Sequence, residues 1–209
     1  MQPTTHETGL LLVISAPSGA GKTTLCEQLL IHQSNTIRAI TCTTREPRDG
    51  EKDGQDYYFL DASTFLKRVQ AGNFLEHATV FGNSYGTLKS EVLGKLRQGK
   101  DVLLNVDVQG AAAIREHATE DAELQRSLVT VFLAPLSMDV LEQRLLKRNK
   151  DSSTTISKRL AVARQEISQW KHFDYIILTD SIESDLLRMQ TIITAEKMRQ
   201  PRVKMPHYE

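Results

Sequence analysis

The chain has 209 residues, 40% of them hydrophobic, which is enough for one sizeable core and lies near the upper size of a typical single domain. Its 26 Lys and Arg residues balance its 26 Asp and Glu residues, so net charge gives no general affinity for nucleic acid or an acidic membrane. Two cysteines, Cys26 and Cys42, are too few for a disulfide framework and suit a reducing compartment. The opening MQPTTHETG lacks the regions of a secretion leader and no apolar run is long enough to span a membrane, so we expect a cytoplasmic protein.

The first predicted element is a strand over residues 10–14, followed by a Gly-rich turn and a helix over 23–33 with leucines at helical spacing. The same order of buried strand and helix recurs at 102–106 with 110–118, 128–133 with 138–147, and 175–178 with 183–199. Such alternation predicts an α/β fold whose parallel sheet is covered by helices on both faces.

Two inserts interrupt this alternation. Residues 37–98 mix strand-like pieces with a helix that Asp61 or Ser63 can cap and Gly72 can end, which predicts a small α+β lobe. Residues 137–165 carry a polar stretch between two charged helices and are interpreted as a mobile lid. The chain is then one domain with its core at 8–36, 99–136 and 166–200, its lobe at 37–98 and its lid at 137–165.

A phosphate-binding loop is predicted between the first strand and the first helix. The segment fits G-x-x-x-x-G-K-[ST] except at its first position and reads Ala16, Pro17, Ser18, Gly19, Ala20, Gly21, Lys22 and Thr23, followed by Thr24. Its backbone N–H groups would hold ATP phosphates, Lys22 would bridge the β- and γ-phosphates, and Thr23 would bind Mg²⁺. A chance Gly-rich turn with a solvated lysine is disfavoured, because strand and helix would have to coincide with the motif.

The segment 41–51, TCTTREPRDGE, resembles the T-T-R-x-P-R-x-G-E signature of guanylate kinases. Further matches follow in the family's order at 56–59, 74–76, 85–87 and 107–110, so the resemblance covers about residues 13–160. It implies a phosphate-loop NTPase-type fold that transfers the γ-phosphoryl group of ATP to GMP and also to dGMP, with Mg²⁺, in purine nucleotide metabolism.

The resemblance assigns the phosphate of GMP to Arg45, Arg48, Tyr57 and Tyr85, with Arg45 also catalytic. Planar guanidinium groups suit bidentate phosphate binding, and tyrosine hydroxyls can add donors. Because the acceptor phosphate is already an anion at neutral pH, it needs charge neutralisation more than a general base. Two arginines around a proline would alone be more typical of a solvated turn, and the phosphate loop decides against that interpretation.

Glu76 is the candidate for the guanine base, since a carboxylate accepts from both N1–H and N2–H₂ and repels adenine. The resemblance adds to the GMP site Thr41, Gly86, Thr87, Asn105 and Asp107. Gly86 is expected to permit close backbone approach. Asn105 stands where the family commonly has an acidic residue, which weakens the base assignment. Asp107 is expected to face Mg²⁺ or its waters, and the alternative is that it caps a helix.

Arg144, Arg148 and Arg159 resemble the lid arginines of the family, with Arg144 and Arg148 on ATP and Arg148 and Arg159 catalytic. Arginines brought in by lid closure would stabilise the charge of the migrating phosphoryl group and exclude water. The alternative is a solvated basic face. Thr179 replaces the Asn that is more common in the adenine-side loop, so ATP as donor is inferred and not read from base contacts.

Three other functions stay open at this point. An interaction module that binds phosphorylated peptides resembles the lobe, but the intact Gly19, Gly21, Lys22 and Thr23 disfavour it. A kinase on the same scaffold that acts on ribose 1,5-bisphosphate is kept open by Asn105. A nucleic-acid-binding protein is the least favoured. We expect ATP and GMP as small-molecule partners, no nucleic acid and no membrane; the oligomeric state is undetermined, and a homodimer is compatible with the sequence.

Overall fold

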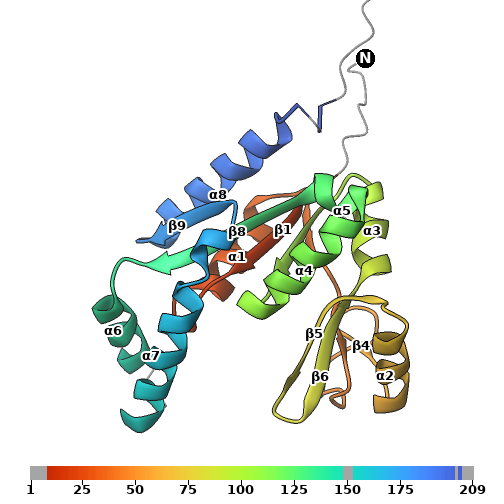
Figure 1. The fold of residues 1–209 in the computed structure, drawn as a ribbon, viewed down its shortest axis with the longest axis horizontal. Coiled ribbons are helices and arrows are strands. Elements are labelled where there is room, and N and C mark those ends of the chain that lie inside the picture. Colours follow the sequence, from red (N-terminus) through yellow and green to blue (C-terminus); the bar gives the residue numbers. More distant parts are fainter. Residues whose placement is uncertain (1–8, 148–152, 201, 204–209) are drawn as a thin grey trace, which may run out of the picture.

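The computed structural model describes residues 9–147, 153–200 and 202–203 (Figure 1). Its main sheet runs in the order β2 (Thr36–Arg38), β7 (Asp101–Asn105), β1 (Leu11–Ser15), β8 (Leu128–Pro135) and β9 (Tyr175–Thr179). Every pairing in this sheet is parallel, as expected for short apolar strands separated by helices. The predicted α/β fold with a parallel sheet is therefore confirmed.

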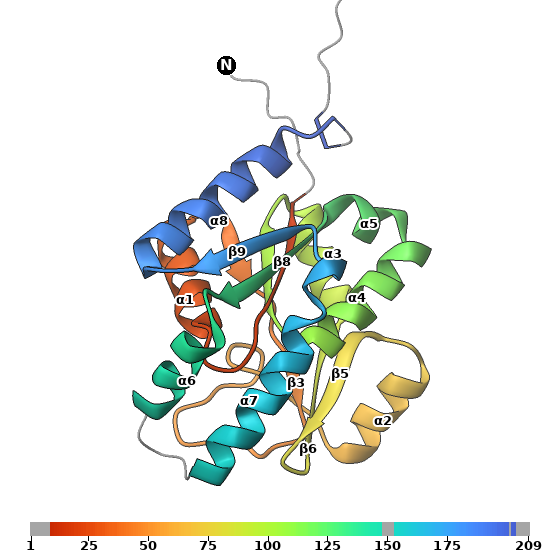
Figure 2. The ribbon, with the colours of Figure 1, turned by 60° about the vertical axis from the view of Figure 1, so that its left-hand side comes forward.

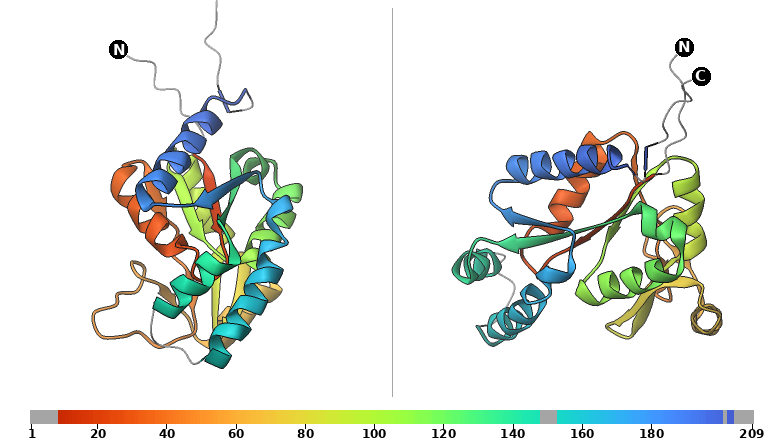
Figure 3. Two further views of the ribbon diagram at one scale, coloured as in Figure 1. Left: turned by 90° about the vertical axis from the view of Figure 1, so that its left-hand side faces the viewer. Right: turned by 45° about the horizontal axis from the view of Figure 1, so that its top comes forward.

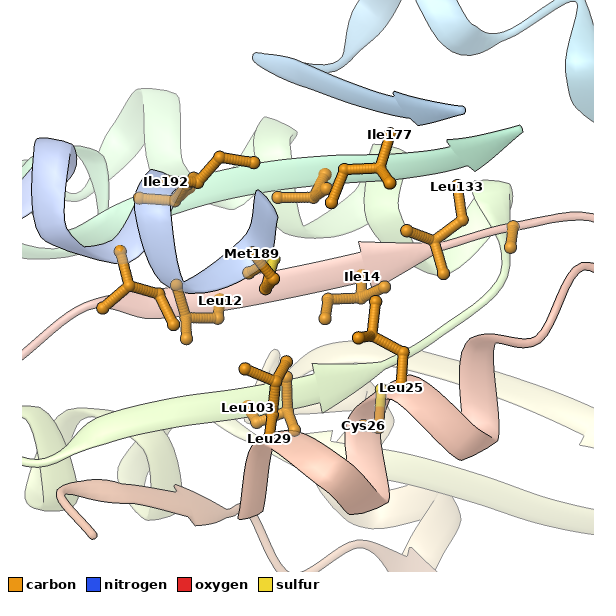
Figure 4. Packing of buried hydrophobic residues seen from close by; sticks show 14 of the residues in the cluster. Leu12, Ile14, Leu25, Cys26, Leu29, Leu103, Leu133, Ile177, Met189 and Ile192 are labelled. Carbon is orange, nitrogen blue, oxygen red and sulfur yellow. The ribbon is translucent and has the colours of Figure 1, made fainter. Parts of the chain in front are cut away.

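Successive side chains of β1 enter two different cores. Leu12 and Ile14 belong to the core on one face, whereas Leu11 and Val13 belong to the core on the other. Helices cover both faces (Figure 3), and Figure 4 shows how the first core fills the space between the sheet and two of the helices. The first core is covered by α1 (Lys22–His32) and α8 (Ile182–Lys197), and the second by α3 (Lys89–Arg97), α4 (Val108–Glu120) and α5 (Ala122–Ser127).

A smaller sheet forms the lobe below the main sheet in Figure 1. The helix α2 (Ala62–Gln70) begins at Asp61, whose carboxylate accepts from the backbone N–H of Thr64 at 2.8 Å, and Gly72 follows it with φ 65°, so both predicted ends are confirmed. Phe65 stacks on Phe74 in a small separate core, with ring centroids 4.6 Å apart. The strand order is β4 (Tyr58–Phe59), β3 (Cys42–Thr43), β6 (Asn83–Leu88) and β5 (Phe74–Val80).

Two segments that the sequence assigned to the lobe belong to the main body. Strand β2 pairs with β7, so residues 37 and 38 lie in the main sheet. On α3, Val92 and Leu96 are fully buried in the core of β1 and β7. Because the apolar face of α3 has its hydrophobic partners in the main sheet, the lobe ends where β6 ends.

The lid segment forms α6 (Met138–Lys147) and α7 (Ser153–Ile167), followed by the short η1 (Trp170–His172). Leu141 and Leu145 of α6 pack on Ala163 of α7 and form a core of their own. In Figures 1 and 2, α6, α7 and the lobe lie at the same end of the molecule, toward which β1 runs. Arg148 lies outside the described residues.

Candidate functional site

The predicted phosphate-binding loop connects β1 to α1. Gly19 and Gly21 both have φ 94°, a left-handed conformation that favours glycine, whereas Ala16 lies outside that region and tolerates its Cβ. The loop surrounds a cavity of about 300 Å³ lined by Ala16, Pro17, Ser18, Gly19, Gly21, Lys22, Thr23, Thr24, Asp107 and Glu166. Ala20 is buried and does not line it.

Lys22 reaches from this loop to the carboxyl end of β7. Its Nζ donates a hydrogen bond to the carbonyl oxygen of Val106 at 2.5 Å. Burial lowers the pKa of the Lys22 ammonium, against the attraction of the Cys26 thiol, Asp107 and Glu166. The amine is thus held in the cavity, where a bound phosphate would favour its charged form.

Glu166, on the last turn of α7, is a residue of this cavity that the sequence analysis missed. Its carboxylate accepts from the backbone N–H of Ser18, and burial raises the pKa of the group. Its Oε2 atom is buried without a hydrogen-bond partner among the described residues. No local motif marks Glu166, because only the packing of the lid on the main body brings α7 to the phosphate loop.

A second cavity of about 410 Å³ lies between the lobe and the carboxyl end of β7. It brings together seven of the predicted GMP-site residues, namely Thr41, Tyr57, Glu76, Tyr85, Thr87, Asn105 and Asp107. Arg38, which the sequence analysis did not single out, also lines it, with its guanidinium 6.0 Å from the centroid of the Tyr57 ring.

Glu76 is held in this cavity by its neighbour across the sheet. The hydroxyl of Thr87 donates to Oε1 of Glu76 at 2.6 Å, so Oε2 remains for another donor. Burial raises the pKa of the Glu76 carboxyl, against the hydrogen bond from Thr87. A half-buried carboxylate whose second oxygen has no hydrogen bond within the described chain is suited to accept hydrogen bonds from a neutral base.

Gly86 is required by packing within the lobe. A Cβ at this position would lie 2.9 Å from Phe74 Cδ1 and 3.0 Å from the carbonyl oxygen of Glu76. The close contact at this position is with β5 across the hairpin, and the approach of a ligand to the Gly86 backbone stays a prediction. Gly86 does not line the cavity; it keeps β5 and β6 close enough for Thr87 to reach Glu76.

Arg45 and Arg48 lie beside this cavity and do not line it. Arg45 Nη2 donates to both carboxylate oxygens of Glu51, at 2.8 and 2.9 Å, and its guanidinium lies 5.5 Å from the centroid of the Tyr57 ring. The hydrogen bond from Arg45 lowers the pKa of Glu51, and the same bond raises the pKa of Arg45. The backbone N–H of Arg48 also donates to Glu51, at 2.8 Å, so one carboxylate holds the Arg45 guanidinium and the main chain at Arg48.

Asp107 and Thr23 line both cavities, which therefore meet at these two side chains. Asp107 caps α4, because its Oδ1 accepts from the backbone N–H groups of Gln109 and Gly110 at 3.0 and 2.8 Å. Both bonds go to one oxygen, so the capping role does not occupy Oδ2. Asn105 is exposed at the carboxyl end of β7, on the wall of the acceptor cavity.

The two lid arginines that the structure describes, Arg144 and Arg159, lie outside both cavities. Arg144 donates from Nη1 to the Thr179 hydroxyl at 3.1 Å and from Nη2 to the Asp180 carbonyl at 3.4 Å, so it joins α6 to the loop after β9. Arg159 is half-buried on α7 and lines neither cavity.

Among the described residues, no cluster of three His, Cys, Asp or Glu side chains could hold a metal ion, and no helix is long and apolar enough to cross a membrane.

Comparisons with known proteins agree with this geometry. The family model described as "Guanylate kinase" matches residues 8–196. A guanylate kinase of Maricaulis maris is 42% identical over 93% of this chain and 86% of its own length, and one of Clostridium perfringens is 41% identical over 94% and 88%. The crystal structure of guanylate kinase from Anaplasma phagocytophilum is 34% identical, covers 94% of this chain and 90% of its own, and superposes with a TM-score of 0.69.

Proposed function

This chain belongs to the guanylate kinase family, and from that premise we propose how its own side chains carry out ATP-dependent phosphorylation of GMP. The enzyme is a phosphotransferase that acts on the nucleoside monophosphate GMP, with ATP as donor. The assignment of residues rests on one observation, that Thr23 and Asp107 line both cavities. Donor phosphates in one cavity and an acceptor phosphate in the other then approach each other at these side chains.

The donor phosphates bind at the loop of residues 16–24. Backbone N–H groups freed by Gly19 and Gly21, together with the N-terminus of α1, hold the phosphate oxygens. Lys22 exchanges the Val106 carbonyl for a phosphate oxygen and neutralises the charge that develops during transfer. Arg144 orients the loop of Thr179 beside the donor, and lid closure brings Arg159 and Arg148 to the migrating group.

The residues where the cavities meet fit a Mg²⁺ ion that is bound chiefly by phosphates. Mg²⁺ commonly keeps several waters and uses one or two protein oxygens together with substrate phosphates. The Thr23 hydroxyl and Oδ2 of Asp107, which the cap does not occupy, supply such oxygens, and the Glu166 carboxylate lines the phosphate cavity. When bound, the ion would neutralise phosphate charge, and these three side chains would orient its ligands.

The acceptor site holds GMP at both ends. Glu76 accepts from guanine N1–H and N2–H₂, with Thr87 fixing the carboxylate and Thr41 and Asn105 adding polar contacts. Arg48, Tyr57 and Tyr85 bind the phosphate beside Arg45, which Glu51 holds in position. The dianionic phosphate needs no general base, so the site acts by positioning and neutralisation. dGMP fits the same contacts, since none of those proposed involves the ribose.

The assignment of Arg48 to the GMP phosphate leads to a prediction for GMP affinity. We expect Arg48→Ala to raise KM for GMP about tenfold or more and to leave KM for ATP within about twofold, because a charge-assisted contact to phosphate contributes roughly 1.5–3 kcal/mol. The measurement is steady-state ADP release with each substrate varied in turn. Arg97→Ala is the matched control, since Arg97 pairs with Glu123 on the surface and lines neither cavity. Equal changes in both KM values would remove Arg48 from the acceptor site.

The function itself is tested by ADP release with ATP, Mg²⁺ and, separately, GMP, dGMP, AMP, CMP, UMP or ribose 1,5-bisphosphate. Strong dependence on GMP is expected, and turnover with the sugar bisphosphate alone would contradict the acceptor assignment.

We further propose that the enzyme works in the cytoplasm, in purine nucleotide metabolism. Cys26 and Cys42 are both buried free thiols, in keeping with a reducing compartment.

A further inference from the structure

A third cavity lies at the other end of the main sheet, where β8 begins. It has a volume of about 420 Å³ and is lined by four arginines and one aspartate, namely Arg115, Arg126, Arg199, Arg202 and Asp174. The arginines come from α4, α5 and the segment after α8. In Figure 2, α5 and the last turns of α8 lie at the upper end of the molecule, and α4 lies below α5. In a chain with zero net charge, this is a local concentration of positive charge.

Two of the arginines are held by the protein itself. Arg202 donates from Nε to the carbonyl oxygen of Arg126 at 2.7 Å and from Nη2 to that of Leu128 at 3.1 Å, and it also pairs with Glu196. Arg199 Nη1 lies 3.3 Å from the same Glu196 carboxylate. Glu196 is buried, so its carboxylate neutralises these two arginines from within the wall and does not project into the cavity.

Arg115 lacks such a partner. Its Nη1 atom is buried without a hydrogen-bond partner among the described residues, and its guanidinium lies 5.1 Å from the centroid of the Phe173 ring. Asp174 attracts it without forming an ion pair, and Asp174 Oδ2 already accepts from the backbone N–H and the hydroxyl of Thr130, both at 2.8 Å. A buried donor left unpaired costs free energy, and a guanidinium does not escape that cost by losing its proton.

Arg126 adds a second free cation. It is exposed on α5, and within the described chain its guanidinium has no ion pair or hydrogen bond, although its carbonyl accepts from Arg202. Asp174 and Glu196 together balance two of the four arginines, so two positive charges remain at the cavity. Arginine is the side chain best suited to bind phosphate oxygens through paired donors.

We propose that this cavity is a binding site for an anion that carries linked phosphate groups, with Arg115 and Arg126 as its principal ligands. Its volume exceeds what a single phosphate ion needs and admits a diphosphate or triphosphate chain. The site is separate from the transfer site. Arg115 lies two turns of α4 beyond the cap Asp107, about 12 Å at 1.5 Å per residue, and neither phosphate-loop nor lobe residues line the cavity.

The test is a titration of the full-length enzyme with sodium pyrophosphate, in which binding is monitored through the NMR signals of the arginine Nε–H groups. Because pyrophosphate is also expected to bind the phosphate loop, the titration is repeated in Lys22→Met. Saturable shifts of the Arg115 and Arg126 signals are expected in both proteins. Arg115→Gln, read from the Arg126 signal, should weaken this binding at least about tenfold. Arg126→Gln, read from the Arg115 signal, should do the same, and tests the site even if Arg115→Gln fails to fold.

Arg97→Gln is the matched control and should leave the affinity unchanged, since Arg97 is an exposed arginine that does not line this cavity. Titrations with tripolyphosphate and ATP identify the source of the phosphate chain: equal affinities indicate the chain alone, and tighter binding of ATP indicates a nucleotide. The proposal is overturned if the Arg126 signal does not shift, if both Gln variants bind as tightly as the wild type, or if sulfate binds as tightly as pyrophosphate.

Discussion

Lys22→Met is expected to lower kcat for ATP and GMP by about 10³-fold or more, because a donor aimed at the developing transition-state charge in a water-poor site contributes roughly this much. Methionine is also unbranched and is one atom shorter than lysine, and it lacks the charge. Lys22 is the amine of the phosphate cavity, it is held there by the Val106 carbonyl, and Asp107 and Glu166 line the same wall. No neighbouring side chain among the described residues of the cavity can replace its positive charge.

The fold should survive this change. Burial lowers the pKa of Lys22, so the protonated amine costs folding stability at any pH below its folded-state pKa. This cost is relieved as pH rises from the folded-state pKa to the higher unfolded-state pKa. Lys22→Met should therefore have a Tm equal to or above that of the wild type at neutral pH. Lys67→Met, at an exposed position on α2, is the matched control and should keep full activity. Normal turnover by purified Lys22→Met would remove the phosphate loop from the mechanism.

The parts of the site that were predictable are those held within one short segment. The phosphate loop and its conformation follow from Gly19, Gly21 and Lys22 in sequence, because a strand, a turn and a helix start are local features. The same is true of the helix cap at Asp61. The role of Asp107 was left between a metal ligand and a cap. In the structure it caps α4 through one oxygen and faces the meeting point of the cavities, so the two interpretations are compatible.

What the sequence did not reveal depends on packing between distant segments. Glu166 reaches the phosphate loop only because α7 packs beside it, and Arg38 reaches the acceptor cavity only because β2 pairs with β7. The sequence analysis assigned the glycine at position 86 to ligand approach, and it did not foresee that Phe74 on the neighbouring strand also requires a glycine there. In each case the sequence shows the residue type, but it does not show which distant residue or segment lies beside it.

The second large effect is expected for base selection. Glu76→Gln should lower kcat/KM for GMP about 10- to 100-fold and change that for AMP little, so the preference for GMP narrows. The physical reason is that a carboxylate accepts from both guanine donors through charge-assisted hydrogen bonds of roughly 1.5–3 kcal/mol, whereas an amide presents one of its own donors to the base. Glu116→Gln, at an exposed position on α4, is the control. An unchanged GMP-to-AMP ratio would assign guanine recognition to other groups.

The pH dependence of stability distinguishes a role of Glu76 in base recognition from a purely structural role. Burial raises the pKa of Glu76 above the usual value near 4.5, so the ionised carboxylate costs stability above the folded-state pKa, and this cost vanishes as pH falls below the unfolded-state value. The amide oxygen that Glu76→Gln introduces can still accept from the Thr87 hydroxyl. The variant should thus melt above the wild type at neutral pH, and the difference should close in acid. Over the same range, acid should reduce kcat/KM for GMP in the wild type more than in the variant, because only the wild type loses a charged acceptor when Glu76 is protonated.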